Sequence, residues 1–314
     1  MRGTLKRGMI AGLQTAWKLS KFIFPITFIV TVLQFTPVLP WVIDIIAPLM
    51  SIFGLPGEAA IPLVLGTALN LYSGIAGILS LELTVKEVFT LAVMLSFAHS
   101  MFIETAVALR VGVKLWVVLV VRFGLAFLSA IAINLLWNGG QDIAKYGMMP
   151  EMTNNPEGWG AILLLALEKA CYGIFQLILI VLPLMIIVQF LRDYGYMTKF
   201  SNLLAPFTKV IGVKPNASMT LVTGLVIGLA YGAGVMIQAV EEDGVSKKDA
   251  TLAFIFLVAC HAIVEDTLIF VPLGIPILPL LAIRVVTAFI LTIAVAYVWR
   301  RAKQKEQAKG VLQQ

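Results

Sequence analysis

The sequence is poor in charge, cysteine and histidine. Only 13% of its 314 residues are charged and 60% are hydrophobic, which leaves too little charge to solvate the surface of a soluble domain of this length. The two cysteines, Cys171 and Cys260, lie in apolar runs and indicate neither a disulfide framework nor a zinc site. The chain lacks GxxxxGK[ST], GxGxxG, HExxH and CxxC motifs. We therefore expect no enzyme activity and no cofactor.

The sequence is rich in long apolar runs. Several approach or exceed about 18 residues with few charges, the length of a membrane-spanning helix. The first run, 22–39, is too long for a signal peptide and lacks a small-residue cleavage site, so we expect an uncleaved first span. The net charge of +6 lies mostly in short connections and tails, which favours positive-inside topology over nucleic-acid binding. The sequence predicts an all-α, multi-pass protein of a bacterial-type inner (plasma) membrane.

The two halves of the chain repeat each other. An offset of 158 residues pairs APLMSIFG at 47–54 with APFTKVIG at 205–212. After a four-residue insertion, an offset of 162 pairs His99 with His261, Glu104 and Thr105 with Asp266 and Thr267, and Arg122 with Arg284. We divide the chain into a first repeat (1–137), an inter-repeat loop read as exposed (138–160), a second repeat (161–299) and a basic cytoplasmic tail (300–314).

Each repeat has the same order of parts. These parts are a first span (16–38; 161–191), a short amphipathic stretch, a glycine-interrupted apolar segment (57–79; 216–237), a histidine-bearing span (86–110; 248–271) and a last span (113–137; 276–299). The amphipathic stretches, at about 15 residues, are too short to cross about 30 Å of hydrocarbon as helices.

The glycine-interrupted segment decides the topology. If it crosses the membrane, each half has four spans and the halves are parallel. If it enters and returns, the halves are inverted, and six basic residues join both termini on the cytoplasmic side: Arg110, Lys114, Arg192, Lys199, Lys209 and Lys214. The positive-inside rule favours the second arrangement. We predict two inverted-topology repeats, each with about three spanning helices, a short amphipathic helix and a re-entrant helical hairpin.

Ionisable residues lie near the centre of the histidine-bearing spans, where each costs about 2.5 to 3.5 kcal/mol to insert. His99 and Glu104 would lie about 140° apart on an ideal helix, so they meet only if the helix is broken or both line a cavity. His261 and Glu265, four residues apart, are expected to share a face. These ionisable residues either pair with neighbouring polar groups to satisfy a buried charge or form a functional site. The presence of two histidines and three acids near mid-membrane favours a functional site.

Polar residues also lie at the expected turn of each hairpin. Asn70, Tyr72 and Ser73 lie among glycines in the first half, and Tyr231 lies in the equivalent region of the second. A helix broken there exposes backbone groups that bind solutes. Close helix packing through small residues, such as Gly224 and Gly228, is the alternative.

The candidate site combines both sets of residues. The candidate substrate-binding residues are Asn70, Tyr72, Ser73, His99, Glu104, Thr105, Tyr231, His261, Glu265, Asp266 and Thr267. Arg122 and Arg284 are expected to pair with charges or to extend to the membrane surface. If a metal binds, the candidate ligands are His99, Glu104, His261, Glu265 and Asp266.

The segment GLPGEAAIPLVLGTALNLYSGIAGI with the following span resembles the Gate, or nucleoside-recognition, domain. That domain occurs in concentrative nucleoside transporters, in the membrane part of ferrous-iron permeases and in spore-maturation-type proteins. The resemblance covers most of the chain, twice, and implies re-entrant hairpins packed with partly unwound helices about a central site. In iron permeases a cysteine precedes the hairpin asparagine, whereas Leu69 stands here, and their GTP-binding domain is absent. Both departures argue against ferrous-iron uptake.

Three functions follow as hypotheses. The first is a transporter-like protein, secondary or partner-driven, with a mid-membrane site for a small polar solute that is nucleoside-like or anionic. The second is a divalent-cation permease that uses the histidines and acids. The third is a non-transporting membrane partner of another Gate-type protein. The expected partners are the lipid bilayer and the solute or ion. A second copy of the chain and a second Gate-type subunit both stay open.

Overall fold

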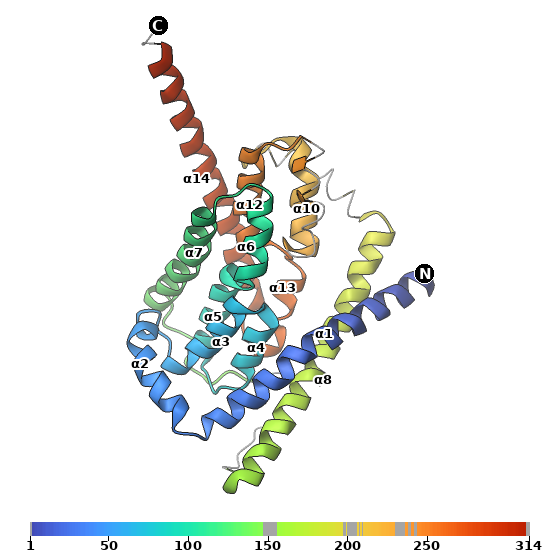
Figure 1. Ribbon diagram of the computed structural model, residues 1–314, viewed down its shortest axis with the longest axis vertical. Helices are drawn as coiled ribbons and strands as arrows, with labels where there is room; N and C mark the ends of the chain where they lie inside the picture. Colours follow the sequence, from blue (N-terminus) through green and yellow to red (C-terminus); the bar gives the residue numbers. More distant parts are fainter. Residues whose placement is uncertain are drawn as a thin grey trace. The chain divides into compact units, whose positions relative to one another are not determined.

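A computed structural model describes residues 2–146, 156–196, 199, 206, 208, 210–229, 236–237, 240–241 and 244–311. The chain divides into two compact units. Figure 1 labels the helices and colours them in sequence order from α1 to α14. Unit 1 comprises residues 1–102, 123–194 and 264–281, and unit 2 comprises residues 103–122, 195–263 and 282–314. Each unit therefore contains segments of both sequence halves.

The described secondary structure is helical apart from one isolated bridge, between Thr84 and Ile143. Unit 1 contains α1 (Arg2–Gln34), α2 (Val38–Ile52), η1 (Gly57–Ala59), α3 (Ala60–Ala68), α4 (Leu71–Leu79), α5 (Val85–Ala98), α8 (Gly158–Asp193), α13 (Glu265–Leu268) and η3 (Val271–Leu273). Unit 2 contains η2 (Pro215–Ala217), α10 (Ser218–Ile227) and α12 (Lys247–Cys260). Three helices begin in one unit and end in the other: α6 (Met101–Arg110), α7 (Leu115–Leu136) and α14 (Ile277–Val311).

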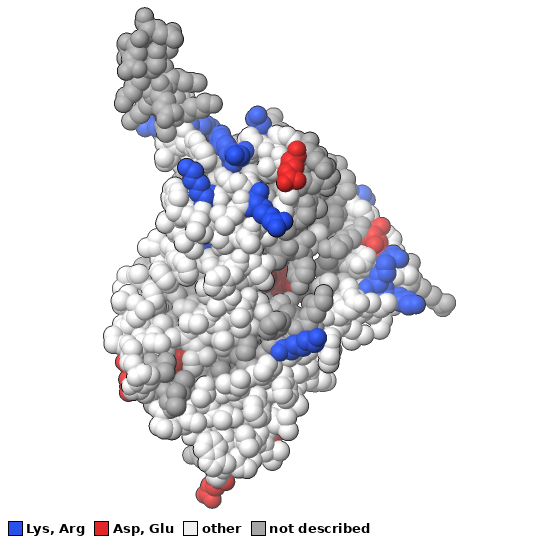
Figure 2. Space-filling view, in the orientation of Figure 1, with Lys and Arg blue, Asp and Glu red and all other residues white. Residues whose placement is uncertain are grey.

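Five described segments are long and apolar enough to cross a membrane, which confirms the prediction of an all-α membrane protein. They are Val85–Arg110, Leu115–Leu136, Gly158–Phe175, Lys247–Leu268 and Ile277–Arg301. The two histidine-bearing segments are 83% and 78% buried, whereas the other three are only 22% to 28% buried. The histidine-bearing spans are thus interior, and the others present their apolar side chains outward. Most of the face drawn in Figure 2 is accordingly neither acidic nor basic.

Helices α1 and α8 pack against each other in unit 1. Gly8 and Gly12, spaced as GxxxG, make the close approach: a Cβ on Gly8 would lie 2.8 Å from Ile186 Cα. Arg7 donates a 2.6 Å hydrogen bond to the Asp193 carboxylate and holds the pKa of that carboxyl below its usual value. Helix α1 begins at Arg2, earlier than the predicted start at residue 16, because the basic segment continues the same helix.

The first glycine-interrupted segment forms a helical hairpin. A Cβ on Gly74 would lie 3.0 Å from Gly66 Cα, and one on Gly77 would lie 2.8 Å from Pro62 Cα. Residues 66 and 74, and 62 and 77, face each other only if α3 and α4 run antiparallel. Each helix has nine residues and is about 13.5 Å long, less than half of a hydrocarbon core. The predicted hairpin is present in this half. Part of the corresponding second segment lies outside the described residues.

Helices α5 and α12 begin at matching caps. The Thr84 hydroxyl accepts a hydrogen bond from Glu87 N, and the Glu87 carboxylate accepts one from Thr84 N, which completes a capping box. In the second half the Ser246 hydroxyl accepts a hydrogen bond from Asp249 N. The stretches TVKE and SKKD, which correspond in the two repeats, therefore have the same role: each begins a helix.

The described part of the inter-repeat loop, within residues 138–146, is mostly exposed, as expected, and it also hydrogen-bonds to the segment before α5. Lys86 N donates to Gly140 O at 2.8 Å, and Ala144 N donates to Leu83 O at 2.9 Å. Trp137 lies edge-on to Phe89, with 5.3 Å between the ring centroids. These contacts give the backbone before α5 the hydrogen-bond partners that it needs.

Candidate functional site

The two histidine-bearing spans break at the same place. Helix α5 ends with His99 as its C-cap (φ −70°, ψ 164°), and α12 ends with His261 in nearly the same conformation (φ −75°, ψ 163°). The following residues, Ser100 (φ 49°) and Ala262 (φ 40°), have the left-handed backbone that non-glycine residues rarely adopt. The helix expected to carry both His99 and Glu104 is therefore broken between them.

Each break is held by a helix from the glycine-interrupted segment of its own half, α3 in the first half and α10 in the second. Ser100 N donates to Gly66 O, and Ala262 N donates to Gly224 O, both at 2.9 Å. Ile263 N adds a 2.7 Å bond to Leu225 O. The amides freed by the broken helix are thus satisfied by carbonyls in the glycine-interrupted segments. Sequence reasoning missed Ser100 and Ala262. Their only signal was their position after the aligned histidines.

The histidine rings are oriented by their own helices. His99 Nδ1 lies 2.7 Å from Leu95 O, and His261 Nδ1 lies 2.8 Å from Leu257 O. Since a carbonyl oxygen can only accept, Nδ1 carries a hydrogen in both rings. Nε2 is therefore the ring nitrogen left to face an acid.

In unit 2, Glu104 contacts two buried basic side chains. Its Oε2 lies 2.9 Å from Arg122 Nη2, and its Oε1 lies 3.2 Å from His261 Nε2. Arg284 Nη2 donates a 2.5 Å bond to the backbone carbonyl of His261. Both arginines are fully buried, so neither side chain extends to the membrane surface. Arg122 is the counter-ion of Glu104, and Arg284 supports the broken end of α12.

In unit 1, the acids of α13 contact the first half of the chain. Asp266 Oδ2 lies 3.9 Å from His99 Nε2, and Glu265 Oε1 accepts a 2.6 Å hydrogen bond from the Tyr72 hydroxyl. The expectation that His261 and Glu265 share a helical face is wrong. Helix α12 ends at Cys260 and α13 begins at Glu265, so the two residues do not belong to one helix.

Each histidine faces the acid of the other sequence half. His261 of the second half faces Glu104 of the first, and His99 of the first half faces Asp266 of the second. Because the repeat pairs these two histidines and these two acids, the contacts are reciprocal. Each sequence half therefore contributes one residue to each of the two contacts, as is expected of two corresponding repeats.

The contact between His261 and Glu104 requires a proton. A neutral His261 ring that donates from Nδ1 to Leu257 presents Nε2 as an acceptor, and an ionised carboxylate also only accepts. Nε2 and Oε1 lie 3.2 Å apart, so one further proton must lie between them. The pair is either imidazolium with carboxylate or imidazole with carboxylic acid. In both forms it holds one exchangeable proton.

The remaining candidates lie in three places. Asn70 is the N-cap of α4, and its Oδ1 accepts hydrogen bonds from Ser73 N at 2.9 Å and Ser73 Oγ at 3.1 Å. Thr105 on α6 and Thr267 on α13 are buried next to the aligned acids. Tyr231 lies outside the described residues. Asn70 and Ser73 thus define the hairpin turn, and Tyr72 connects it to Glu265.

Each unit offers one imidazole and one carboxylate to a metal ion. His99 and Asp266 provide them in unit 1, and His261 and Glu104 provide them in unit 2. These are two of the ligand types that divalent transition metals take. Arg122 lies 2.9 Å from Glu104 and would repel a cation bound there, so the unit 2 pair is the poorer metal site.

Two segments of the chain match one known protein family. The family described as Gate, nucleoside recognition, matches residues 16–114 and again residues 174–292. The chain is similar to the uncharacterized membrane protein YvoD of Bacillus subtilis (strain 168), with 59% identity over 312 residues, which cover 99% of this chain and 100% of that protein. No solved structure matches the chain.

Proposed function

We propose, since this chain belongs to the Gate (nucleoside recognition) family of membrane proteins, that it is a proton-driven secondary carrier of a small polar solute. The solute is nucleoside-like or anionic and binds beside the broken helices. The observation that carries the proposal is the pair of matched breaks at His99 and His261, each next to a buried acid.

Broken helices support a carrier. Irregular backbone at membrane depth is tolerated only where protein or a water-filled cavity surrounds it, and in secondary transporters such breaks line the solute site. Buried ionisable groups in a span are expensive and are retained mainly where they act on a solute or an ion. Both features occur together at His99 and His261.

A proton is the coupling ion that fits the described residues. The Glu104–His261 pair holds one exchangeable proton, and releasing it changes the charge of a buried site that already contains Arg122. The same Arg122 disfavours a divalent cation at Glu104. Cation permeation is therefore the weaker alternative and becomes an outcome of the test.

The proposed orientation places both termini and the basic connections in the cytoplasm, in a bacterial-type inner membrane. The inter-repeat loop then lies on the outer side. A second Gate-type subunit, or a second copy of this chain, would be an additional partner and is not needed for the proposed site.

Reconstituted transport tests the proposal. The purified full chain is placed in liposomes with an imposed pH gradient and is offered nucleosides, small organic anions and divalent cations in turn. We expect gradient-dependent accumulation of one polar solute, abolished by a protonophore. In His261→Gln, which keeps hydrogen-bonding capacity but cannot hold the ring proton, we expect solute exchange to persist and gradient-driven accumulation to disappear.

Two further variants locate the pathway. His99→Ala and Asp266→Asn are expected to reduce transport, whereas Asp142→Asn, which removes an exposed acid, is not. Intact transport in both His99→Ala and Asp266→Asn would exclude the histidine–acid site from the pathway. Movement of a divalent cation instead of a solute would establish the permease, and no movement of any compound would leave the chain as a membrane partner.

A further inference from the structure

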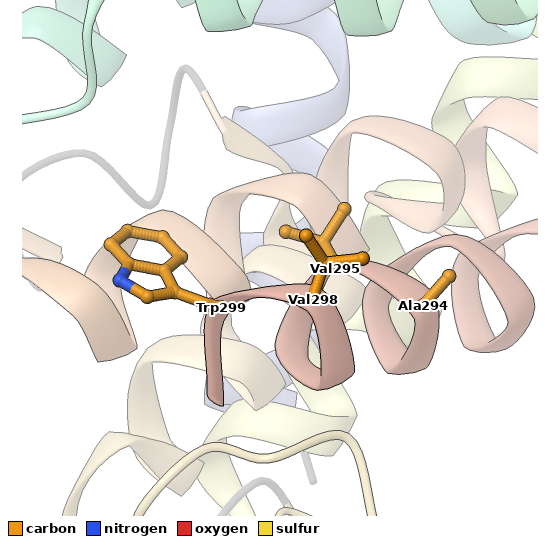
Figure 3. A pocket seen from close by; sticks show the side chains of 4 residues that line it. All are labelled: Ala294, Val295, Val298 and Trp299. Atoms are coloured by element: carbon orange, nitrogen blue, oxygen red, sulfur yellow. The ribbon is translucent and has the colours of Figure 1, made fainter. Parts of the chain in front are cut away.

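An apolar groove on the second half of α14, within unit 2, lies next to a basic segment. The groove has a volume of about 360 Å³, and its described lining comes from four residues of α14: Ala294, Val295, Val298 and Trp299 (Figure 3). The opposite face of α14, with Ala288, Thr292 and Ala296, is fully buried. The groove therefore belongs to the outward face of the helix.

The groove lies where a membrane helix meets the lipid headgroups. Helix α14 has 35 residues and is about 52 Å long, so it extends beyond about 30 Å of hydrocarbon. The apolar part of the helix ends at Arg301. Tyr297 and Trp299, just before that end, are 47% and 39% exposed, as is usual for aromatic residues at the membrane interface.

The basic residues continue the line of the groove. Helix positions 294, 298, 301 and 305 follow the i, i+4, i+7, i+11 spacing of one face, so Ala294 and Val298 are followed on the same stripe by Arg301 and Lys305. The Arg301 guanidinium lies over the Tyr297 ring, 4.7 Å from its centroid, which fixes its direction. Residues 300–309 contain five basic residues and one acid, Glu306. Arg300 and Arg301, the described basic residues of this segment, are both exposed.

We propose that this groove is a binding site for an anionic phospholipid. One acyl chain occupies the groove along Val298 and Trp299, and the headgroup phosphate pairs with Arg301 at the start of the basic segment 300–309. An apolar groove that leads directly into clustered positive charge matches a molecule with an apolar tail and an anionic head, and clusters of basic residues beside a membrane helix recognise such lipids. The site is separate from the histidine–acid residues and does not depend on transport.

Native mass spectrometry of the purified full chain tests this site. The protein is offered phosphatidylglycerol or phosphatidylcholine with the same acyl chains, and retained lipid is counted. We expect about one phosphatidylglycerol per chain to be retained preferentially. Arg301→Gln should weaken its binding about fivefold, and Val298→Trp should weaken it to a similar extent by filling the groove. Both side chains are exposed, so neither variant disturbs the core.

The matched control is Arg110→Gln, which removes an exposed arginine at the end of α6 and should leave retention unchanged. Equal weakening in this control would show nonspecific attraction and would overturn the proposal. So would unchanged binding in Val298→Trp, which would mean that charge alone holds the lipid. Displacement of the lipid by inorganic phosphate, or equal retention of phosphatidylcholine, would also overturn it.

Discussion

At the scale of single residues, the buried ion pair between Glu104 and Arg122 should dominate stability. Both side chains are almost completely buried, and their charged atoms lie 2.9 Å apart. Arg122→Gln leaves the Glu104 carboxylate without its counter-ion, and we expect a loss of about 3 to 5 kcal/mol in the free energy of unfolding. The thermal midpoint of the purified protein in detergent measures this loss.

The double variant Glu104→Gln with Arg122→Gln removes both charges and should recover most of that stability, because neutral amides are far cheaper to bury than a lone charge. Arg110→Gln, at an exposed position, is the control and should change the free energy by no more than about 0.5 kcal/mol. If Arg122→Gln were as mild as Arg110→Gln, the ion pair would not form in solution.

The left-handed backbone at the breaks can be tested with two alanine-to-glycine substitutions that should change stability in opposite directions. Ala262 has φ 40°, so Ala262→Gly should be neutral or stabilising by up to about 1 kcal/mol, because glycine adopts this backbone without cost. Ala259→Gly, three residues earlier inside α12, should instead cost about 1 kcal/mol. Thermal midpoints that fall equally in both variants would show that α12 continues through residue 262.

At the scale of elements, the hairpin of α3 and α4 depends on glycines that allow the two backbones to touch. A Cβ on Gly77 would lie 2.8 Å from Pro62 Cα, and backbone cannot move aside as a flexible side chain can. Gly77→Ala should therefore separate the helices and lower the thermal midpoint.

Gly124 in α7 is the matched control for this variant. A Cβ there would meet nothing within 4 Å. Gly124→Ala should therefore raise the free energy of unfolding by about 0.4 to 1 kcal/mol, because alanine lowers the conformational entropy of the unfolded chain. A Gly77→Ala protein that unfolds no earlier than the Gly124→Ala protein would contradict the close contact between α3 and α4.

Local sequence patterns were sufficient to predict the elements. TVKE and SKKD contain their own caps, and Gly66 and Gly74 mark the hairpin within one short segment. The break at His261 was not predictable in this way, because no proline or glycine lies between Cys260 and Glu265. It is stabilised by carbonyls of α10, which are distant in sequence, so the pattern around His261 resembles a continuous helix.

At the scale of the whole molecule, the repeat predicted which residues correspond but not which residues touch. It aligned His99 with His261 and Glu104 with Asp266, and the structure pairs each histidine with the acid of the opposite half. An alignment of two halves contains no distances between them. The exchange of partners follows only from their packing, and it joins the repeats through contacts that neither repeat could make alone.

The predicted inverted topology determines which connections share a side of the membrane, and labelling can test this prediction. In a variant with Cys171→Ser and Cys260→Ser, single cysteines are introduced by Asn138→Cys and Lys114→Cys, both at exposed positions. With re-entrant hairpins, the chain crosses the membrane once between these positions and residue 138 lies outside. A membrane-impermeant thiol reagent should then label Asn138→Cys in intact cells and Lys114→Cys only after permeabilisation.

With crossing segments instead of hairpins, the labelling pattern would be reversed. The α3–α4 contacts at Gly66 and Gly77 favour the re-entrant arrangement, because two antiparallel helices of about 13.5 Å return the chain toward the side from which it came.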